Sequence, residues 1–217
     1  AGSARDWFVR AGASEGDGTR ARPFADPWQA LDKCEAGDAI HVAEGEYTGR
    51  LDQGFWVIPF ERVQLIGGYD AQFTARDPWT HLTRLVWKGG KNRPTEARVS
   101  SNARDVVLDG LVLDSRQANN YVDEAGTGRK DLIGAVSIYL HLPGTVRNCV
   151  VINPAQVALQ CQPGTLIENN LFLNAVRWAI EVRPGSGDVA RLKAKLRRNT
   201  ILFSWDEDSP GKGGERG

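Results

Sequence analysis

Short apolar segments alternate with polar turn residues along almost the whole chain. The apolar segments have the size of β-strands, and Gly, Asn, Asp or Pro separates them from one another. Many short strands without helical crossovers indicate a β-sandwich, a β-barrel or a β-solenoid. The predicted strands lie at 4–10, 39–42, 62–66, 84–87, 106–108, 111–113, 136–140, 150–152, 157–159, 171–173, 180–182 and 201–203.

One segment near the start of the chain has the pattern of a helix. Asp26 is a good N-cap residue, Pro27 fits the first helical position, and Gln29 completes a capping box. Gly37 stands where a left-handed C-cap is expected. The sequence therefore predicts a short helix over 26–37, and no second helix.

Internal repeats distinguish between the three β-architectures. A polar residue followed by an apolar strand recurs at intervals of 39, 21 and 30 residues. A unit of about 21 residues, lengthened by insertions, is typical of a solenoid. We interpret it as a parallel β-helix with three short strands per coil. Its polar positions then form a structural ladder at one corner, with a row of catalytic residues as the alternative: Asp109, Asn148, Asn169 and Asn199.

The segments GDGTRARPF, PWQALDKCEAGDAIHVAEGEYTG and VQLIGGYDAQFTARDP resemble the N-terminal part of pectin-lyase-like, right-handed parallel β-helix repeat proteins. The resemblance covers most of the chain and implies the fold. It also implies a secreted or surface protein, of a kind common in environmental bacteria. It does not choose among pectate lyases, other polysaccharide lyases, glycoside hydrolases, epimerases, phage tailspikes and adhesins.

The expected architecture is thus an all-β, right-handed parallel β-helix with a short N-terminal capping helix. We expect one β-helix domain over 1–205, followed by a polar, Gly-rich tail or truncation point over 206–217. No C-terminal capping element is evident in that tail. An uncapped solenoid exposes strand edges, so a protein partner or a second copy is expected there.

The resemblance implies that substrate lies along the first strand of each coil. Alternation along these strands gives two outward rows, Tyr139–Gln160–Glu181 and His141–Gln162–Arg183. A one-residue shift in register would turn Tyr139 and His141 inward. In a glycan groove, Tyr139 would stack on a sugar, the two glutamines would bind hydroxyls, and Arg183 would pair with a uronate. The alternative is a solvated sheet face without a ligand.

The sequence does not identify the catalytic residues. If the protein is an enzyme of the lyase or hydrolase type, the candidates are Glu181, Arg183, His141, Tyr139 and Asp131. Two polar segments, 89–104 and 115–134, are expected as loops bordering the groove. The second supplies Asp131 as an acid, with Arg116 and Tyr121 as further substrate-binding residues. The outward rows hold one carboxylate, which disfavours calcium, and no metal or other cofactor is expected.

Composition excludes some functions and leaves the glycan hypothesis open. With 27 basic and 27 acidic residues, the chain has no basic excess for nucleic acid. No apolar run is long enough to span a membrane. The chain begins at Ala1 without Met, as expected for a mature or trimmed protein, which fits an extracellular, periplasmic or surface location. The 3 cysteines are expected to be buried free thiols.

The sequence therefore predicts a secreted or surface β-helix protein that contacts a polysaccharide along its outward sheet face. The competing prediction is a non-catalytic structural or adhesive module in a larger surface assembly. The Trp residues at 56, 79, 178 and 205 are either sugar platforms or coil packing.

Overall fold

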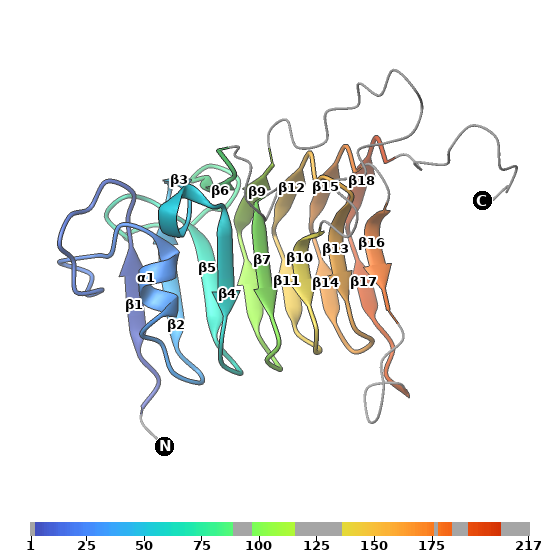
Figure 1. The fold of residues 1–217 in the computed structure, drawn as a ribbon, viewed down its shortest axis with the longest axis horizontal. Helices are drawn as coiled ribbons and strands as arrows, with labels where there is room; N and C mark the ends of the chain where they lie inside the picture. The colour runs from blue at the N-terminus through green and yellow to red at the C-terminus, as the bar shows by residue number, and fades with distance from the viewer. Residues whose placement is uncertain (1–2, 89–96, 116–135, 176–177, 184–190, 205–217) are drawn as a thin grey trace, which may run out of the picture.

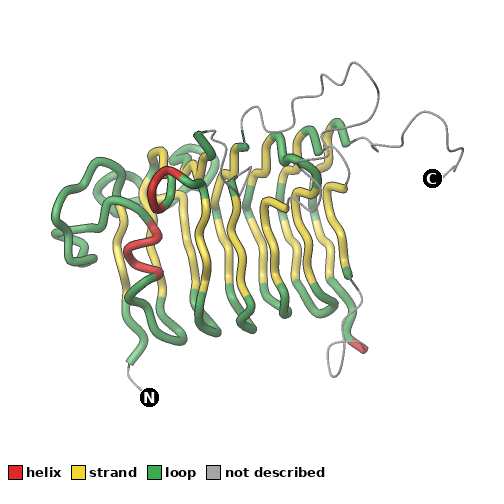
Figure 2. The backbone as a smooth tube through the Cα atoms, in the orientation of Figure 1, coloured by secondary structure: helices red, strands yellow, loops and turns green. Residues whose placement is uncertain are grey.

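The computed structural model describes residues 3–88, 97–115, 136–175, 178–183 and 191–204. It is a parallel β-helix, in which the strands of each coil lie beside those of the next coil along the long axis (Figure 1, Figure 2). The all-β solenoid expected from the repeats is confirmed. Every pairing between named strands is parallel, and each coil contributes to three sheets in turn.

The first sheet contains seven strands and the second contains six. In spatial order the first sheet is β1 (Asp6–Val9), β2 (Ala39–Ala43), β5 (Gln64–Tyr69), β8 (Val107–Asp109), β11 (Thr145–Arg147), β14 (Leu166–Glu168) and β17 (Lys195–Arg197). The second sheet is β3 (Gly45–Tyr47), β6 (Thr83–Val86), β9 (Leu111–Asp114), β12 (Val150–Ile152), β15 (Leu171–Leu173) and β18 (Thr200–Leu202).

The third sheet, which carries the predicted outward rows, contains five strands. They are β4 (Phe55–Ile58), β7 (Arg98–Ser101), β10 (Val136–Leu140), β13 (Val157–Cys161) and β16 (Trp178–Val182). A 3-10 helix (Arg50–Asp52) precedes β4. The polar loop predicted over 89–104 is therefore wrong in part, because β7 lies within it. Only one large apolar residue, Val99, marks that strand in the sequence.

The core consists of apolar side chains that stack on one another from coil to coil. In the first sheet, Leu65, Leu108, Val146 and Ile167 occupy consecutive strands in register and are fully buried. Because parallel strands repeat at about 4.8 Å, each side chain packs against its equivalents in the coils before and after it. This stacking places residues of successive coils at predictable positions on the outer face as well.

The predicted helix forms, but it is shorter than 26–37. Helix α1 spans Pro27–Leu31, with Asp26 as N-cap and a complete capping box. It packs against β1, β2 and β4. The chain turns away after the helix because the Asp38 carboxylate accepts hydrogen bonds from the backbone N–H groups of Glu35 and Arg5. That carboxylate directs the chain into β2.

The corner between the first and second sheets repeats a left-handed backbone residue in the last four described coils. The residues at this position are Gly110, Asn148, Asn169 and Arg198, with φ of 71°, 54°, 55° and 53°. Asn169 Nδ2 donates to Asn148 Oδ1 at 2.9 Å, and Asn148 Nδ2 donates to Asp109 Oδ1 at 2.8 Å. Asn tolerates this conformation and bonds its equivalent in the next coil.

The predicted ladder of four residues therefore divides into two rows. Asn199 does not join Asn169, because Leu171 pairs with Thr200 and the last coil is shifted by one residue from the predicted alignment. Asn199 Oδ1 instead accepts from Asn170 Nδ2 at 2.9 Å. Asn170 is buried, and it was missed because it stands in a strand-like run beside the more obvious Asn169.

Candidate functional site

The outward rows of the third sheet have the register that the repeats predicted. Tyr139 pairs with Gln160, and Gln160 pairs with Glu181, on three consecutive strands. One residue beyond the strands, His141 N–H donates to Ser101 O and Arg183 N–H donates to Cys161 O. Gln162 occupies the position between them. The structure therefore brings together the six residues of the two rows.

Burial along this face is uneven. Ile138 and Leu159 are fully buried, as expected for inward positions. Ser137 and Ala158, predicted to point outward, are also fully buried, and Gln160 is only 2% exposed. His141 and Arg183 are exposed, and Tyr139 is half-buried. The face of the sheet is therefore not uniformly exposed to solvent, because the Gln160 side chain in its middle is buried while His141 and Arg183 at its edge are exposed.

One side of the site combines two rings and a guanidinium group. The rings of Tyr139 and His141 stack with centroids 3.8 Å apart, and the Arg98 guanidinium lies 5.7 Å from the Tyr139 centroid. Burial, together with the positive charge of Arg98, lowers the pKa of His141 below its ordinary value of 6.5. His141 is thus neutral near pH 7 and keeps one ring nitrogen as a hydrogen-bond acceptor.

Arg98 was missed as a site residue. It belongs to β7, which the sequence placed inside a loop, so its side chain had no predicted face. Ser100 of the same strand pairs with Tyr139, which places Arg98 on the same side of the sheet. The only feature of the sequence that indicates strand β7 is the polar–apolar–polar alternation of Arg98, Val99 and Ser100.

Polar atoms without hydrogen-bond partners lie along the whole site, from Arg98 to Glu181. Among the described residues, the buried atoms Gln160 Nε2, Glu181 Oε2 and Arg98 Nε make no hydrogen bond. The second carboxylate oxygen, Glu181 Oε1, accepts from Arg183 Nε at 3.1 Å. A buried polar group without a partner is costly, and in native proteins it commonly marks a place where a ligand, water or ion binds. The site therefore offers both donors and an acceptor to a polar molecule.

Three predicted residues, Arg116, Tyr121 and Asp131, lie outside the described residues, and so does Trp205. The other tryptophans differ in environment. Trp56 is buried, and its indole N–H donates to Asp26 Oδ1 at 2.8 Å, so it packs within a coil. Trp79 and Trp178 are exposed. Trp178 begins β16 and therefore lies on the third sheet.

Metal and thiol chemistry have little support in the parts of the chain that are described. There, no group of three or more His, Cys, Asp or Glu side chains is placed to hold a metal ion. Glu181 is the one carboxylate in the two outward rows, which is too few for calcium.

The three cysteines are free and buried, as predicted. Burial raises the pKa of Cys34 and Cys161 to about 11 and that of Cys149 to about 12, so they are protonated at neutral pH.

A polar cavity of about 440 Å³ lies at the corner between the first and second sheets, and no residue of the outward rows lines it. Its charged groups largely neutralise one another. Asp109 accepts from Arg76 Nη2 at 2.6 Å and from Arg147 Nε at 2.7 Å, and Glu168 pairs with Arg198. Burial alone would raise the pKa of Asp109, but hydrogen bonds from Asn148, Arg76 and Arg147 outweigh it and lower that pKa. We interpret this cluster as part of the structural ladder.

No protein-family model matches the chain, and searches of curated proteins and of solved structures found no match either. Within the described residues, no helix has the length and hydrophobicity needed to cross a membrane. The site is therefore interpreted from its own geometry.

Proposed function

We propose that this protein is a carbohydrate-binding β-helix that holds an acidic polysaccharide along the outward face of the third sheet. The observation that carries the proposal is Gln160, which is buried, has an unpartnered amide nitrogen, and lies between Tyr139 and Glu181. Hydroxyl groups of a sugar would supply the missing acceptor there and a donor to Glu181 Oε2.

The dimensions of the face fit an extended polymer. Equivalent positions on neighbouring strands repeat at about 4.8 Å, so a row across three strands extends over one or two sugar units. The Tyr139 ring offers a flat apolar surface of the kind that stacks on sugars. Arg98 and Arg183 outnumber the single carboxylate Glu181, which favours a ligand that carries uronate groups.

The resemblance to pectin-lyase-like proteins supports the same ligand class. It also supports the proposal that the protein acts outside the cytoplasm, as a secreted or surface protein. If the protein cleaves its ligand as a lyase, a base removes the proton next to the uronate carboxylate and the glycosidic oxygen leaves as a double bond forms. The candidates for that base are His141, Tyr139 and Arg183. Arg98 is a further cation that could pair with the uronate carboxylate.

The test is titration calorimetry of the full chain with polygalacturonate and alginate, with dextran as a neutral comparison. We expect the wild type to bind an acidic polymer, and we expect Glu181→Ala and Arg183→Ala each to abolish that binding without lowering the melting temperature. The matched control is Glu61→Ala, which removes the acid of the exposed Glu61–Arg62 pair outside the site. Unchanged binding in both site variants would exclude this face.

Cleavage is tested in the same samples by the ultraviolet absorbance of unsaturated products. An increase in absorbance that is lost in His141→Ala or Arg183→Ala shows a lyase. Binding without any increase shows that the protein is not a lyase, and a reducing-end assay then separates a hydrolase from a binding protein.

A structural or adhesive module is the second candidate function. Its support is a set of large apolar side chains that are exposed among the described residues away from the last coil, such as Leu51, Phe60 and Trp79. Exposed apolar surface is available for contact with other proteins. No binding to any acidic glycan, together with tight protein association, would favour this candidate.

A further inference from the structure

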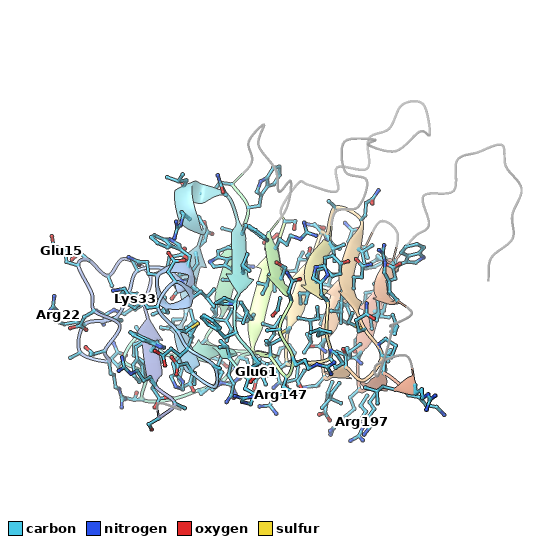
Figure 3. The ribbon with its side chains drawn as sticks, turned by 60° about the horizontal axis from the view of Figure 1, so that its bottom comes forward. Glu15, Arg22, Lys33, Glu61, Arg147 and Arg197 are labelled. Atoms are coloured by element: carbon cyan, nitrogen blue, oxygen red, sulfur yellow. The ribbon has the colours of Figure 1, made fainter. Side chains whose placement is uncertain are left out.

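A cavity of about 460 Å³ lies between the loop that follows β1 and the turn that follows β5. The residues that line it all belong to the continuously described range 3–88: Arg10, Arg20, Ala21, Ala71, Gln72 and Phe73. Figure 3 shows Glu15 and Arg22 on the same loop, at the end of the solenoid opposite Arg197. The cavity is therefore separate from the outward face of the third sheet.

Both walls of the cavity are fixed by hydrogen bonds of their own. The loop returns to β1, where the Arg10 N–H donates to Phe24 O at 2.8 Å. In the turn, the Phe73 N–H donates to Asp70 O at 3.0 Å, and the Asp70 carboxylate accepts from the Thr74 N–H at 2.7 Å. Because these bonds close each wall independently, the cavity exists before any ligand enters.

Two guanidinium groups are anchored side by side on the turn. Arg20 Nη2 donates to the carbonyl oxygens of Phe73 at 2.6 Å and Gln72 at 3.3 Å. Arg10 Nη1 lies 3.4 Å from the carbonyl oxygen of Ala71. Since consecutive residues are about 3.8 Å apart, the two positive charges are held near one another, and their repulsion is a cost that the fold retains.

No carboxylate offsets these two charges in the described part of the chain. The cavity lining contains no Asp or Glu, and neither Arg10 nor Arg20 forms an ion pair there. Arg22, two residues after Arg20, differs in this respect, because its Nη1 lies 3.5 Å from Asp17 Oδ2. Guanidinium groups bind oxyanions through paired N–H donors, so an anion is the complement that this cavity requires.

The rest of the lining is apolar. The Phe73 ring is held edge-on to Phe8, with centroids 5.1 Å apart, and lies 6.1 Å from the Tyr69 ring. It is only 8% exposed, and the methyl groups of Ala21 and Ala71 lie on the same cavity. Apolar surface with a few convergent polar groups, in a volume of about 300–1,000 Å³, is typical of a small-molecule site.

We infer that this cavity binds a small organic anion, whose carboxylate or phosphate group lies between Arg10 and Arg20 and whose apolar group lies against Phe73. This binding site is additional to the polysaccharide face and does not depend on glycan binding there.

An NMR titration of the full chain at 0.15 M salt tests the inference. The probes are benzoate and phenyl phosphate, with phenol and inorganic phosphate as compounds that each lack one half of the proposed ligand. We expect the backbone amide signals of Gln72 and Phe73 to shift and saturate with an aromatic anion. Binding of phenol and of inorganic phosphate should be about tenfold weaker, and the tighter aromatic anion identifies the preferred oxyanion.

Two variants of Ala21 separate charge from size, because they keep both arginines and their carbonyl anchors. Ala21 is exposed on the cavity rim, so either substitution leaves the core intact. Ala21→Asp adds a carboxylate beside the guanidinium groups and should weaken binding about tenfold, whereas the neutral Ala21→Asn should bind as the wild type does. Arg20→Gln should also weaken binding about tenfold, and Arg22→Gln, which removes the paired cation of the same loop, should not.

Three results would overturn the inference. The first is the absence of saturable shifts at Gln72 and Phe73 with both aromatic anions. The second is binding of phenol or inorganic phosphate as tight as that of the aromatic anions. The third is equal affinity in Ala21→Asp and Ala21→Asn, or an equal loss in Arg20→Gln and Arg22→Gln, since the charge at Arg10 and Arg20 would then have no specific role.

Discussion

Replacing Asn170 with Ala tests whether a buried amide holds successive coils together. Asn170 is 2% exposed, and its side chain makes three hydrogen bonds. Its Oδ1 accepts from Cys149 N–H at 2.9 Å, and its Nδ2 donates to Val146 O at 3.0 Å and to Asn199 Oδ1 at 2.9 Å. It thereby joins its own coil to the coil before and to the coil after.

The expected loss follows from these contacts. Each net hydrogen bond contributes about 1 kcal/mol, and the buried Cys149 N–H left without a partner adds about 1 kcal/mol more. We therefore expect Asn170→Ala to lower the free energy of unfolding by about 3–5 kcal/mol. For a chain of this length, that corresponds to a decrease of about 10 °C in Tm.

Asn169→Ala is the matched control, one residue away in the same corner. Its Nδ2 makes one side-chain bond, to Asn148, and its backbone is left-handed with φ of 55°. One lost bond and the strain of a left-handed Ala together cost about 2–3 kcal/mol, which is less than the loss expected for Asn170→Ala. Urea denaturation of the wild type and both variants measures the difference. An Asn170→Ala variant no less stable than Asn169→Ala would refute the interpretation of Asn170 as the link between coils.

Three further predictions concern ionisable groups. Asp109→Asn should destabilise the fold by about 2–3 kcal/mol in urea denaturation, because Arg76 and Arg147 lose a buried anion. Folding lowers the pKa of Asp109, so the ionised carboxylate contributes fully to the free energy of unfolding above the pKa of the unfolded state, and this contribution is lost as pH falls through the pKa of the folded state. Below about pH 4, the stability of the wild type should therefore fall more steeply than that of Asp109→Asn. Arg98→Gln should raise the pKa of His141 in an NMR titration, since a neighbouring positive charge is removed; an unchanged value would show that Arg98 does not act on His141. The native protein should react slowly with a thiol reagent at pH 8 and rapidly after unfolding, and fast native labelling would contradict the burial of Cys34, Cys149 and Cys161.

The sequence predicted the fold because the dominant physical signal is repetition. Segments such as 148–153 and 169–174 recur at a spacing of one coil, and they pair in the structure with the same spacing. The register of Tyr139, Gln160 and Glu181 followed from the same repeat together with alternation.

Other features depend on tertiary contacts that local patterns do not encode. Strands β11, β14 and β17 have three residues each, with Val146, Ile167 and Leu196 as their inward residues, so alternation is too short to show them. The one-residue shift that moved Asn199 next to Asn170 depends on the length of an insertion. The role of Arg98 emerged only once β7 was placed beside β10.

The most direct test of the central claim observes Gln160 itself. In ¹H–¹⁵N spectra of the full chain, side-chain amide signals report the environment of each glutamine. On addition of oligogalacturonate we predict that the amide signals of Gln160 shift and saturate, while those of Gln53, an exposed residue that precedes β4, do not. Saturable shifts at Gln53 without any at Gln160, or no shift with any acidic glycan, would contradict the proposed binding face.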